Sequence, residues 1–317
     1  MLPCGTCHYL HVCTVVVSLE PGARVPLRLL GVRDELTSRP WRPPARHWPG
    51  SPLIGGIDEE AGGTWLAVHP GIPRVACLLN GRGQPADPAR RRSRGDLSLR
   101  AAAEGPGFLS QLASDLSALA AYDPFHLICA TLDSVTALTW EGSYLPGGRP
   151  PVPPDVRAGE PDRKDRDLIR PARTDESRRT APVVREDASR ELAPVVRNLA
   201  PGTHLFTNAG HAYPAEPGDP APDPKAAHFA EKFAAAHPSA DPALPVAQAW
   251  GDWLTLASGD GLDPADPAAI IVRHDLPDGR VYGTTSVTLV ALADGAVRYD
   301  FQPHPGSPDG WYPVAIG

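Results

Sequence analysis

The chain has little lysine, no long apolar run and no regular cysteine pattern, and these absences limit the kinds of protein that it can be. Only three of its 30 basic residues are lysines, Lys164, Lys225 and Lys232. No segment approaches the roughly 18 apolar residues of a membrane-spanning helix, so we expect a soluble protein without a membrane span. The five cysteines are irregularly spaced and make no disulfide framework, which favours a reducing, cytoplasmic location.

The charge balance argues against a nucleic-acid partner. The formal net charge is -7 and the sequence pI is about 5.9, so the chain lacks the basic excess that binds phosphate backbones. The cluster Arg90-Arg91-Arg92 with Arg94 could form a phosphate site, but we interpret it as a solvated loop. With 317 residues, 42% of them hydrophobic, the chain can bury a sizeable core. Its oligomeric state is not predicted.

Short runs rich in Val, Leu, Ile and Thr predict strands, and apolar residues at helical spacing predict helices over 108–121, 226–236 and 246–257. Turn-forming residues at 20–24 and at Asp294-Gly295 predict two hairpins. Strands in pairs with helices grouped between them indicate an α+β fold with antiparallel sheets. The predicted strands are 13–19, 27–32, 64–68, 74–79, 126–131, 135–140, 204–207, 269–274, 284–292 and 296–301.

Residues 145–203 differ in composition from the rest of the chain. They contain no aromatic residue, and ten acidic and ten basic side chains lie between Asp155 and Glu191. Such a segment cannot bury enough apolar area to order itself, so we expect a disordered, proline- and charge-rich insertion. The expected organisation is a leader at 1–12, one domain at 13–144 and 204–317, and the insertion between its two parts.

Cys13 begins the first apolar run, and Arg33 and Asp34 follow the second. The predicted hairpin returns them to Cys13, as in an N-terminal nucleophile site. There the α-amine, with an ordinary pKa of about 8, accepts the proton of a thiol whose pKa is about 8.5. Arg33 would favour the thiolate and Asp34 would orient the ammonium. Neighbours on a strand point to opposite faces, so both can face the thiol only where the strand ends or kinks.

An attacking thiolate also needs hydrogen-bond donors where the oxyanion forms. Asn80 and Asn208 each end a predicted strand, although asparagine is common there because it tolerates turn geometry. The candidate catalytic set is therefore Cys13, Arg33, Asp34, Asn80 and Asn208. No metal site is expected in the domain, and no pattern identifies cofactor-binding residues.

Cys13 is internal in the sequence as written, so its α-amine must be exposed by some step. The abundance of Ala, Gly, Pro and Arg is typical of GC-rich bacterial coding sequences, in which GTG is a common start codon. We hypothesise that translation begins at Val12, read as Met, and that Met removal leaves Cys13 first. Autocatalytic removal of residues 1–12 is a less economical alternative.

The leader also contains a motif that suggests other chemistry. Cys4-Gly5-Thr6-Cys7-His8 matches the haem c attachment pattern, and His11 could complete a zinc set with Cys4 and Cys7. Haem attachment requires export, and no apolar signal segment is present. We interpret residues 1–12 as translated upstream sequence or a frayed tail.

Nine short segments spread over about 13–302 stand in the order of one known family: Cys13–Val17, Val32–Glu35, Ser38–Pro40, Gly62–Leu66, Leu79–Asn80, Arg94–Leu97, Pro201–Thr203, Thr207–Ala209 and Tyr282–Ser286. On these segments the chain resembles the NRDE family, which is the family of transport and Golgi organization protein 2. The resemblance implies a fold like the N-terminal nucleophile hydrolases, a four-layer αββα sandwich, similar to the branch with penicillin V acylase and bile salt hydrolase. It implies Cys13 as nucleophile, Arg33 and Asp34 as its partners, and Asn80 and Asn208 as oxyanion or substrate contacts.

Three functions stay open at this point. The first is a cofactor-free hydrolase of a linear amide or thioester. The second is a non-catalytic carrier of haem or an acyl-CoA-like lipid, because eukaryotic relatives are linked to haem mobilisation and lipid metabolism; His47, His69 and His211 are candidate haem ligands. The third is a decayed site acting as an interaction module, since Val32 replaces the Asn of the family name and Thr285 stands where relatives commonly have arginine.

We expect protein made from the native gene to begin at Cys13. Its intact mass should then correspond to residues 13–317. A mass that includes Met1 to His11 would contradict translation from Val12.

Overall fold

The computed structural model describes residues 13–142, 193–215, 223–305 and 310–316, which belong to one compact unit. Its strands form two antiparallel sheets, and its helices are few, so the predicted α+β class with antiparallel sheets is confirmed. The predictions of a leader at 1–12 and of a disordered insertion at 145–203 fall largely on residues that the structure does not describe, because 1–12 and 143–192 lie outside the described residues.

Within the described residues, sheet A has eight strands and sheet B has seven. Sheet A runs β11-β10-β1-β2-β13-β14-β15, with β12 paired to β13, and sheet B runs β3-β4-β5-β6-β7-β8-β9. The strands of sheet A are β1 Thr14–Leu19, β2 Leu27–Leu36, β10 Gly202–Thr207, β11 Gly210–Tyr213, β12 Arg273–Asp275, β13 Val281–Ala293, β14 Ala296–Gln302 and β15 Tyr312–Pro313. The strands of sheet B are β3 Trp41–Ala45, β4 Ile54–Asp58, β5 Leu66–His69, β6 Arg74–Asn80, β7 Phe125–Ala130, β8 Val135–Trp140 and β9 Val195–Leu199.

Both predicted hairpins are confirmed. Strands β1 and β2 pair in the register Leu19 with Leu27, and Gly22 takes the positive φ of 85° that the turn between them requires. Strands β13 and β14 pair up to Ala293 with Ala296 around a second positive-φ glycine, Gly295.

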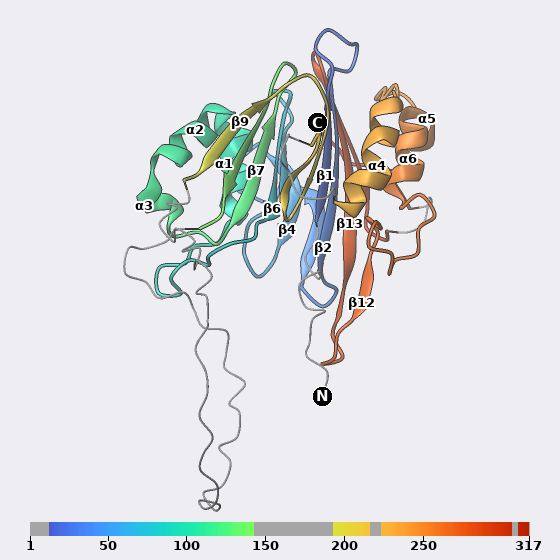
Figure 1. The fold of residues 1–317 in the computed structure, drawn as a ribbon. Helices are drawn as coiled ribbons and strands as arrows, with labels where there is room; N and C mark the ends of the chain where they lie inside the picture. Colours follow the sequence, from blue (N-terminus) through green and yellow to red (C-terminus); the bar gives the residue numbers. More distant parts are fainter. Residues whose placement is uncertain (1–12, 143–192, 216–222, 306–309, 317) are drawn as a thin grey trace, which may run out of the picture. The chain divides into compact units, whose positions relative to one another are not determined.

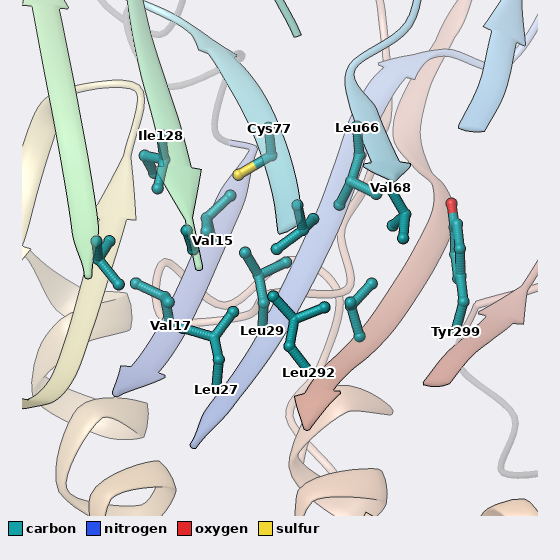
Figure 2. Close-up of a cluster of buried hydrophobic side chains, with 14 of the residues drawn as sticks. Val15, Val17, Leu27, Leu29, Leu66, Val68, Cys77, Ile128, Leu292 and Tyr299 are labelled. Atoms are coloured by element: carbon teal, nitrogen blue, oxygen red, sulfur yellow. The ribbon is translucent and has the colours of Figure 1, made fainter. Parts of the chain in front are cut away.

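The two sheets share one apolar core. Side chains of sheet A such as Val15, Leu29 and Leu292 pack with Leu66 and Ile128 of sheet B, and all five are almost completely buried. Figure 2 shows these side chains meeting from strands of both sheets. Strand β1 is buried along its whole length, β2 from Leu27 to Asp34 and β13 from Thr285 to Leu292, because both faces of sheet A are covered.

Helices cover the outer face of each sheet, as Figure 1 shows. Leu97 and Leu109 join the buried cluster of sheet B, whereas Phe229, Trp250 and Trp253 join that of sheet A. The two tryptophans are therefore core residues. The helices are α1 Gly95–Glu104, α2 Gly107–Ser114 and α3 Leu116–Leu119 against sheet B, and α4 Pro224–Ala235, α5 Val246–Trp250 and α6 Asp252–Ala257 against sheet A.

Several predicted boundaries are wrong. Strand β2 continues to Leu36 instead of ending at residue 32, and of the range 269–274 only its end belongs to a strand, β12. The helix predicted over 108–121 is interrupted at Asp115, and the one over 246–257 at Gly251, whose φ is 47°. Residues 195–199, predicted to be disordered, form β9 and pair with β8, because a sheet edge orders a segment whose own composition does not.

Some elements were absent from the prediction. Strand β3 contains Pro43 and Pro44, and these prolines are tolerated because the strand lies at the edge of sheet B. Strand β4 contains Gly55 and Gly56, where a Cβ atom would lie 2.3 Å from the Leu66 carbonyl oxygen and 2.4 Å from the Trp65 ring. Strands β11 and β15 and helix α1 were also not predicted. Among the described residues, no helix has both the length and the apolar character needed to cross a membrane.

Replacing Leu29 with alanine tests the core between the sheets. Leu29 is fully buried, so Leu29→Ala should lower the free energy of unfolding by about 2 to 5 kcal/mol in urea denaturation. The control is Leu116→Ala, which truncates a side chain that is 58% exposed and should change the value by no more than about 0.5 kcal/mol. Equal effects of the two changes would contradict this description of the core.

Candidate functional site

A cavity of about 390 Å³ lies where the strand bearing Cys13 meets sheet B. It is lined by Cys13, by Arg33, Asp34 and Glu35 of β2, by Asp58 at the end of β4, by Asn80 at the end of β6, and by the loop that leads into α1. Four of the five predicted site residues therefore line one cavity. The fifth, Asn208, is not among the lining residues but contacts Asn80.

The β1–β2 pairing brings the Cys13 thiol to Asp34. Thr14 pairs with Val32, so the chain of Cys13 runs alongside Arg33 and Asp34. The Sγ atom lies 3.5 Å from both the main-chain nitrogen and the main-chain oxygen of Asp34. Cys13 as a whole residue is half-buried, and it lines the cavity.

Arg33 faces sheet B. Its Nη2 donates to the Asp58 Oδ2 atom at 3.1 Å, its Nη1 donates to the Thr285 Oγ1 atom at 2.9 Å, and the guanidinium lies 4.6 Å from the centre of the Trp65 ring. Asp58 also accepts two hydrogen bonds from Arg39. Burial favours the neutral form of Asp58, but the hydrogen bonds from Arg39 and the Ala61 main chain and the nearby arginine charges outweigh it and lower its pKa.

Asp34 makes its contacts on the other face of sheet A. Its Oδ1 atom accepts a hydrogen bond from the Thr284 hydroxyl at 2.7 Å, and its main-chain oxygen accepts one from the Tyr282 hydroxyl at 3.0 Å. Among the described residues, its buried Oδ2 atom has no hydrogen-bond partner. Arg33 and Asp34 thus follow strand alternation, and the irregularity in the ladder lies opposite them, at Thr285 of β13.

Lys225 is a site residue that the sequence interpretation missed. It is 3% exposed, and its Nζ atom lies 3.3 Å from the Thr14 Oγ1 atom and 3.9 Å from the Asp34 Oδ2 atom. It follows Pro224 in the first turn of α4, where Asp223 caps the helix. The sequence did contain a signal for its burial. Lys225, Phe229 and Phe233 are four residues apart, which places the lysine on the same helix face as the two buried aromatic side chains.

Asn208 joins the two sheets. Its side-chain Nδ2 atom donates to the main-chain oxygen of Asn80 at 2.5 Å, and its main-chain oxygen lies 3.4 Å from the His126 Nε2 atom. Its Oδ1 atom is buried without a hydrogen-bond partner among the described residues. Burial lowers the pKa of His126 to about 4, so this ring is neutral near pH 7. Asn208 therefore acts on the site through the position of Asn80.

The far wall of the cavity is held by a contact between main chains. A Cβ atom added at Gly63 would lie 2.4 Å from the carbonyl carbon of Gly95, the first residue of α1. The Thr64 main-chain nitrogen donates to the Gly95 oxygen at 2.9 Å. Arg91, Arg92, Ser93 and Arg94, which precede α1, thereby line the cavity.

The family model for transport and Golgi organisation 2 (TANGO2) matches residues 12–299. The chain belongs to the TANGO2 family. No curated protein matches it. The match covers all of sheet B, most of sheet A and every residue of the candidate site, so the cavity is a feature of the family domain of this chain.

The three histidines considered as haem ligands lie outside the cavity of this TANGO2 domain. His47 contacts the Pro43 main-chain oxygen at 2.8 Å, His69 accepts from the Ile72 main-chain nitrogen at 3.0 Å, and His211 lies 3.1 Å from His204. Within the described part of the chain, no three His, Cys, Asp or Glu side chains group as metal ligands would.

Burial dominates the titration of the three central groups. It raises the pKa of the Cys13 thiol to about 12, assisted by the negative charge of Asp34 and opposed by the main chain of Asp34 and by Arg33 and Lys225. It raises the pKa of Asp34 to about 6, against the charge of Lys225 and the Thr284 hydrogen bond. It lowers the pKa of Lys225, against the charges of Asp34 and Cys13. The thiol is therefore protonated near neutral pH in the chain that retains its preceding residues.

The pKa of Asp34 predicts a pH-dependent stability. Between the ordinary value of 3.8 and about 6, the folded state retains a proton that the unfolded state releases, so rising pH favours unfolding. The free energy of unfolding of the wild type, relative to that of Asp34→Asn, should fall by about 3 kcal/mol across this window. Urea denaturation at intervals from pH 3.5 to pH 7 measures it.

Thr284→Val supplies the comparison for this experiment. It removes the hydrogen bond that favours ionised Asp34, so the decline should extend to higher pH than in the wild type. A difference between wild type and Asp34→Asn that does not vary with pH would contradict the buried position of this carboxyl group.

Proposed function

We propose that this TANGO2-family protein is an N-terminal-cysteine hydrolase of a linear amide or thioester, with Cys13 as the nucleophile. The observation that carries the proposal is the position of the thiol, which lines the cavity against the main chain of Asp34. The charges of Arg33 and Lys225 both favour its thiolate form. Lys225 is thus a second buried cation near the thiol, in a chain where Thr285 stands in place of the arginine common among relatives.

The fold supports this proposal. Two sheets with a shared core and helices against both outer faces are the layers that an αββα sandwich requires. In the proposed assignment this is an N-terminal nucleophile hydrolase fold, and Cys13 immediately precedes β1 of sheet A.

The reaction requires Cys13 to be the first residue of the mature protein. While residues precede it, its nitrogen is an amide and cannot accept a proton. A free α-amine is covalently held next to the thiol, and as an ammonium it lowers the thiol pKa. The start of the family match at residue 12, immediately before Cys13, supports this requirement.

The steps follow from these groups. The α-amine accepts the thiol proton, and the thiolate attacks the substrate carbonyl carbon. When the carbon–nitrogen or carbon–sulfur bond breaks, the α-ammonium returns the proton to the leaving amine or thiol, and an acyl-cysteine thioester remains. Water, deprotonated by the same amine, then hydrolyses the thioester.

Asn80 is the proposed side-chain donor to the oxyanion, because it lines the cavity with Cys13. Asn208 is assigned a positioning role, since its amide nitrogen is engaged by the Asn80 main chain. A haem or lipid carrier is the weaker alternative, because His47, His69 and His211 do not line the cavity. An interaction module without catalysis has no specific contact in its favour.

Labelling with an iodoacetamide probe at pH 7 tests the nucleophile. Two forms of the protein are compared, one beginning at Cys13 and one retaining residues 1–12. In the first form Cys13 should react at least about 10-fold faster than the buried Cys77 and Cys129 of the folded protein, because its pKa is lowered by the α-amine. In the second form it should react slowly.

Turnover of a panel of amide and thioester substrates completes the test. Cys13→Ala in the form beginning at residue 13 should abolish hydrolysis, whereas the matched variant Cys77→Ala should retain it because Cys77 lies in the core between the sheets. The hydrolase proposal fails if Cys13 of the trimmed, folded protein reacts no faster than Cys77.

A further inference from the structure

We propose that the cavity binds an anionic group of its small-molecule ligand, a carboxylate or a phosphate, through Arg94. As an anion site this inference stands on the geometry of Arg94. As a statement of substrate class it rests on the proposed function, because it then describes an acyl compound with a charged group at a distance from the scissile bond.

Arg94 differs from the other arginines of the cavity in having no acidic partner among the described residues. Arg33 and Arg39 are paired with Asp58, Arg91 with Asp123 at 3.2 Å, and Arg92 with Asp96 at 3.6 Å. The Arg94 side chain makes one hydrogen bond within the described residues, which Nη1 donates to the Pro124 main-chain oxygen at 2.6 Å. Its guanidinium therefore retains donors that no carboxylate of the described chain uses.

The position of Arg94 makes this unpaired charge costly. The side chain is half-buried at the entry of α1, and burial lowers its pKa, opposed by the charges of Asp123, Cys13 and Glu35. A guanidinium that has lost part of its hydration without gaining a counter-ion is stabilised by an anionic ligand. Its planar fork of donors fits the two oxygens of a carboxylate or phosphate.

The surroundings favour an anion over a cation. Five arginines and four carboxylic acids line the cavity. At the Arg94 wall the balance is more one-sided, because Arg91 and Arg92 line the same part of the cavity and Asp123 is the lining acid there. The interpretation of this arginine cluster as a solvated loop holds for the exposed Arg91 and Arg92 but not for Arg94.

Arg94 and Cys13 are placed so that one ligand can contact both. Both residues line the cavity, and a negative charge on the Cys13 sulfur raises the pKa of Arg94. A volume of about 390 Å³ accommodates a small molecule that reaches both groups. In the proposed reaction, Arg94 would hold the anionic end of the acyl compound while its carbonyl carbon meets the thiol.

Isothermal titration with two probes, glutarate and inorganic phosphate, tests the site. The wild type should bind at least one of them saturably with one site per chain. Binding of glutarate alone identifies a carboxylate site, binding of phosphate alone identifies a phosphate site, and binding of both identifies a site that accepts either. Arg94→Gln should weaken the binding at least about 10-fold, and Arg94→Lys should weaken it less because it retains the charge but not the fork.

Arg100→Gln is the matched control. Arg100 lies on the same helix, is exposed and paired with Glu104, and does not line the cavity, so its replacement should leave the affinity unchanged. If Arg94→Gln fails to fold, as judged by circular dichroism, Arg94→Lys carries the test. The inference is overturned if neither probe binds, or if the folded Arg94 variants bind as tightly as the wild type.

Cys13→Ala separates this inference from the proposed hydrolase. It should bind the probe as the wild type does, because the anion site does not use the thiol. Probe binding without any hydrolysis would refute the proposed function and leave the anion site standing. Hydrolysis whose turnover is unchanged in Arg94→Gln would refute the stated substrate class and leave the hydrolase standing, while the titration alone decides the anion site.

Discussion

The pairing of β1 with β2 is the constraint on which the candidate site depends. It aligns Thr14 with Val32, and so sets the Cys13 thiol against the main chain of Asp34. A slip of one residue would turn every side chain of β1 to the opposite face. Val15 and Val17 would then leave the core between the sheets, so the same apolar contacts that stabilise the fold also hold the thiol in the cavity.

Sheet A separates two groups of buried charges. Arg33 contacts Asp58 on the side of sheet B, and Asp34 lies near Lys225 on the side of the helices. Buried ion pairs add little net stability, because the desolvation of both partners offsets their attraction. The Lys225 Nζ atom and the Asp34 Oδ2 atom are 3.9 Å apart, which is too far for a hydrogen bond. This pair therefore does little to offset the free-energy cost of burying its two charges. A role in controlling charge near Cys13 accounts for it better than a role in packing.

The sequence predicted those parts of the fold that depend on local pattern. The β1–β2 hairpin follows from apolar runs separated by a turn, and it was sufficient to bring Cys13, Arg33 and Asp34 together. Strand β4 was not predictable, because its glycines are explained by the close approach of Leu66 and Trp65, which lie elsewhere in the fold.

The site was predicted less completely, because pairing between distant residues decides it. Lys225 and Asp34 are far apart in sequence, and only the packing of α4 on sheet A brings them together. Asn208 was expected as an oxyanion or substrate contact, yet its hydrogen bond to Asn80 reflects the meeting of two sheets. Similarly, Arg94 is distinguished from its neighbours by the absence of an acidic partner in the described structure, which composition alone does not reveal.

The contact between Gly63 and Gly95 has a consequence for how the cavity can vary. Because the two main chains touch, the separation between the loop after β4 and the start of α1 is fixed without any side chain. Exchanging the arginines and acids around the cavity would alter its charge and lining while the spacing of these two main chains stayed the same. Side-chain substitution can therefore change the chemistry of this wall without moving its frame, and any side chain larger than hydrogen at Gly63 would force the two main chains apart.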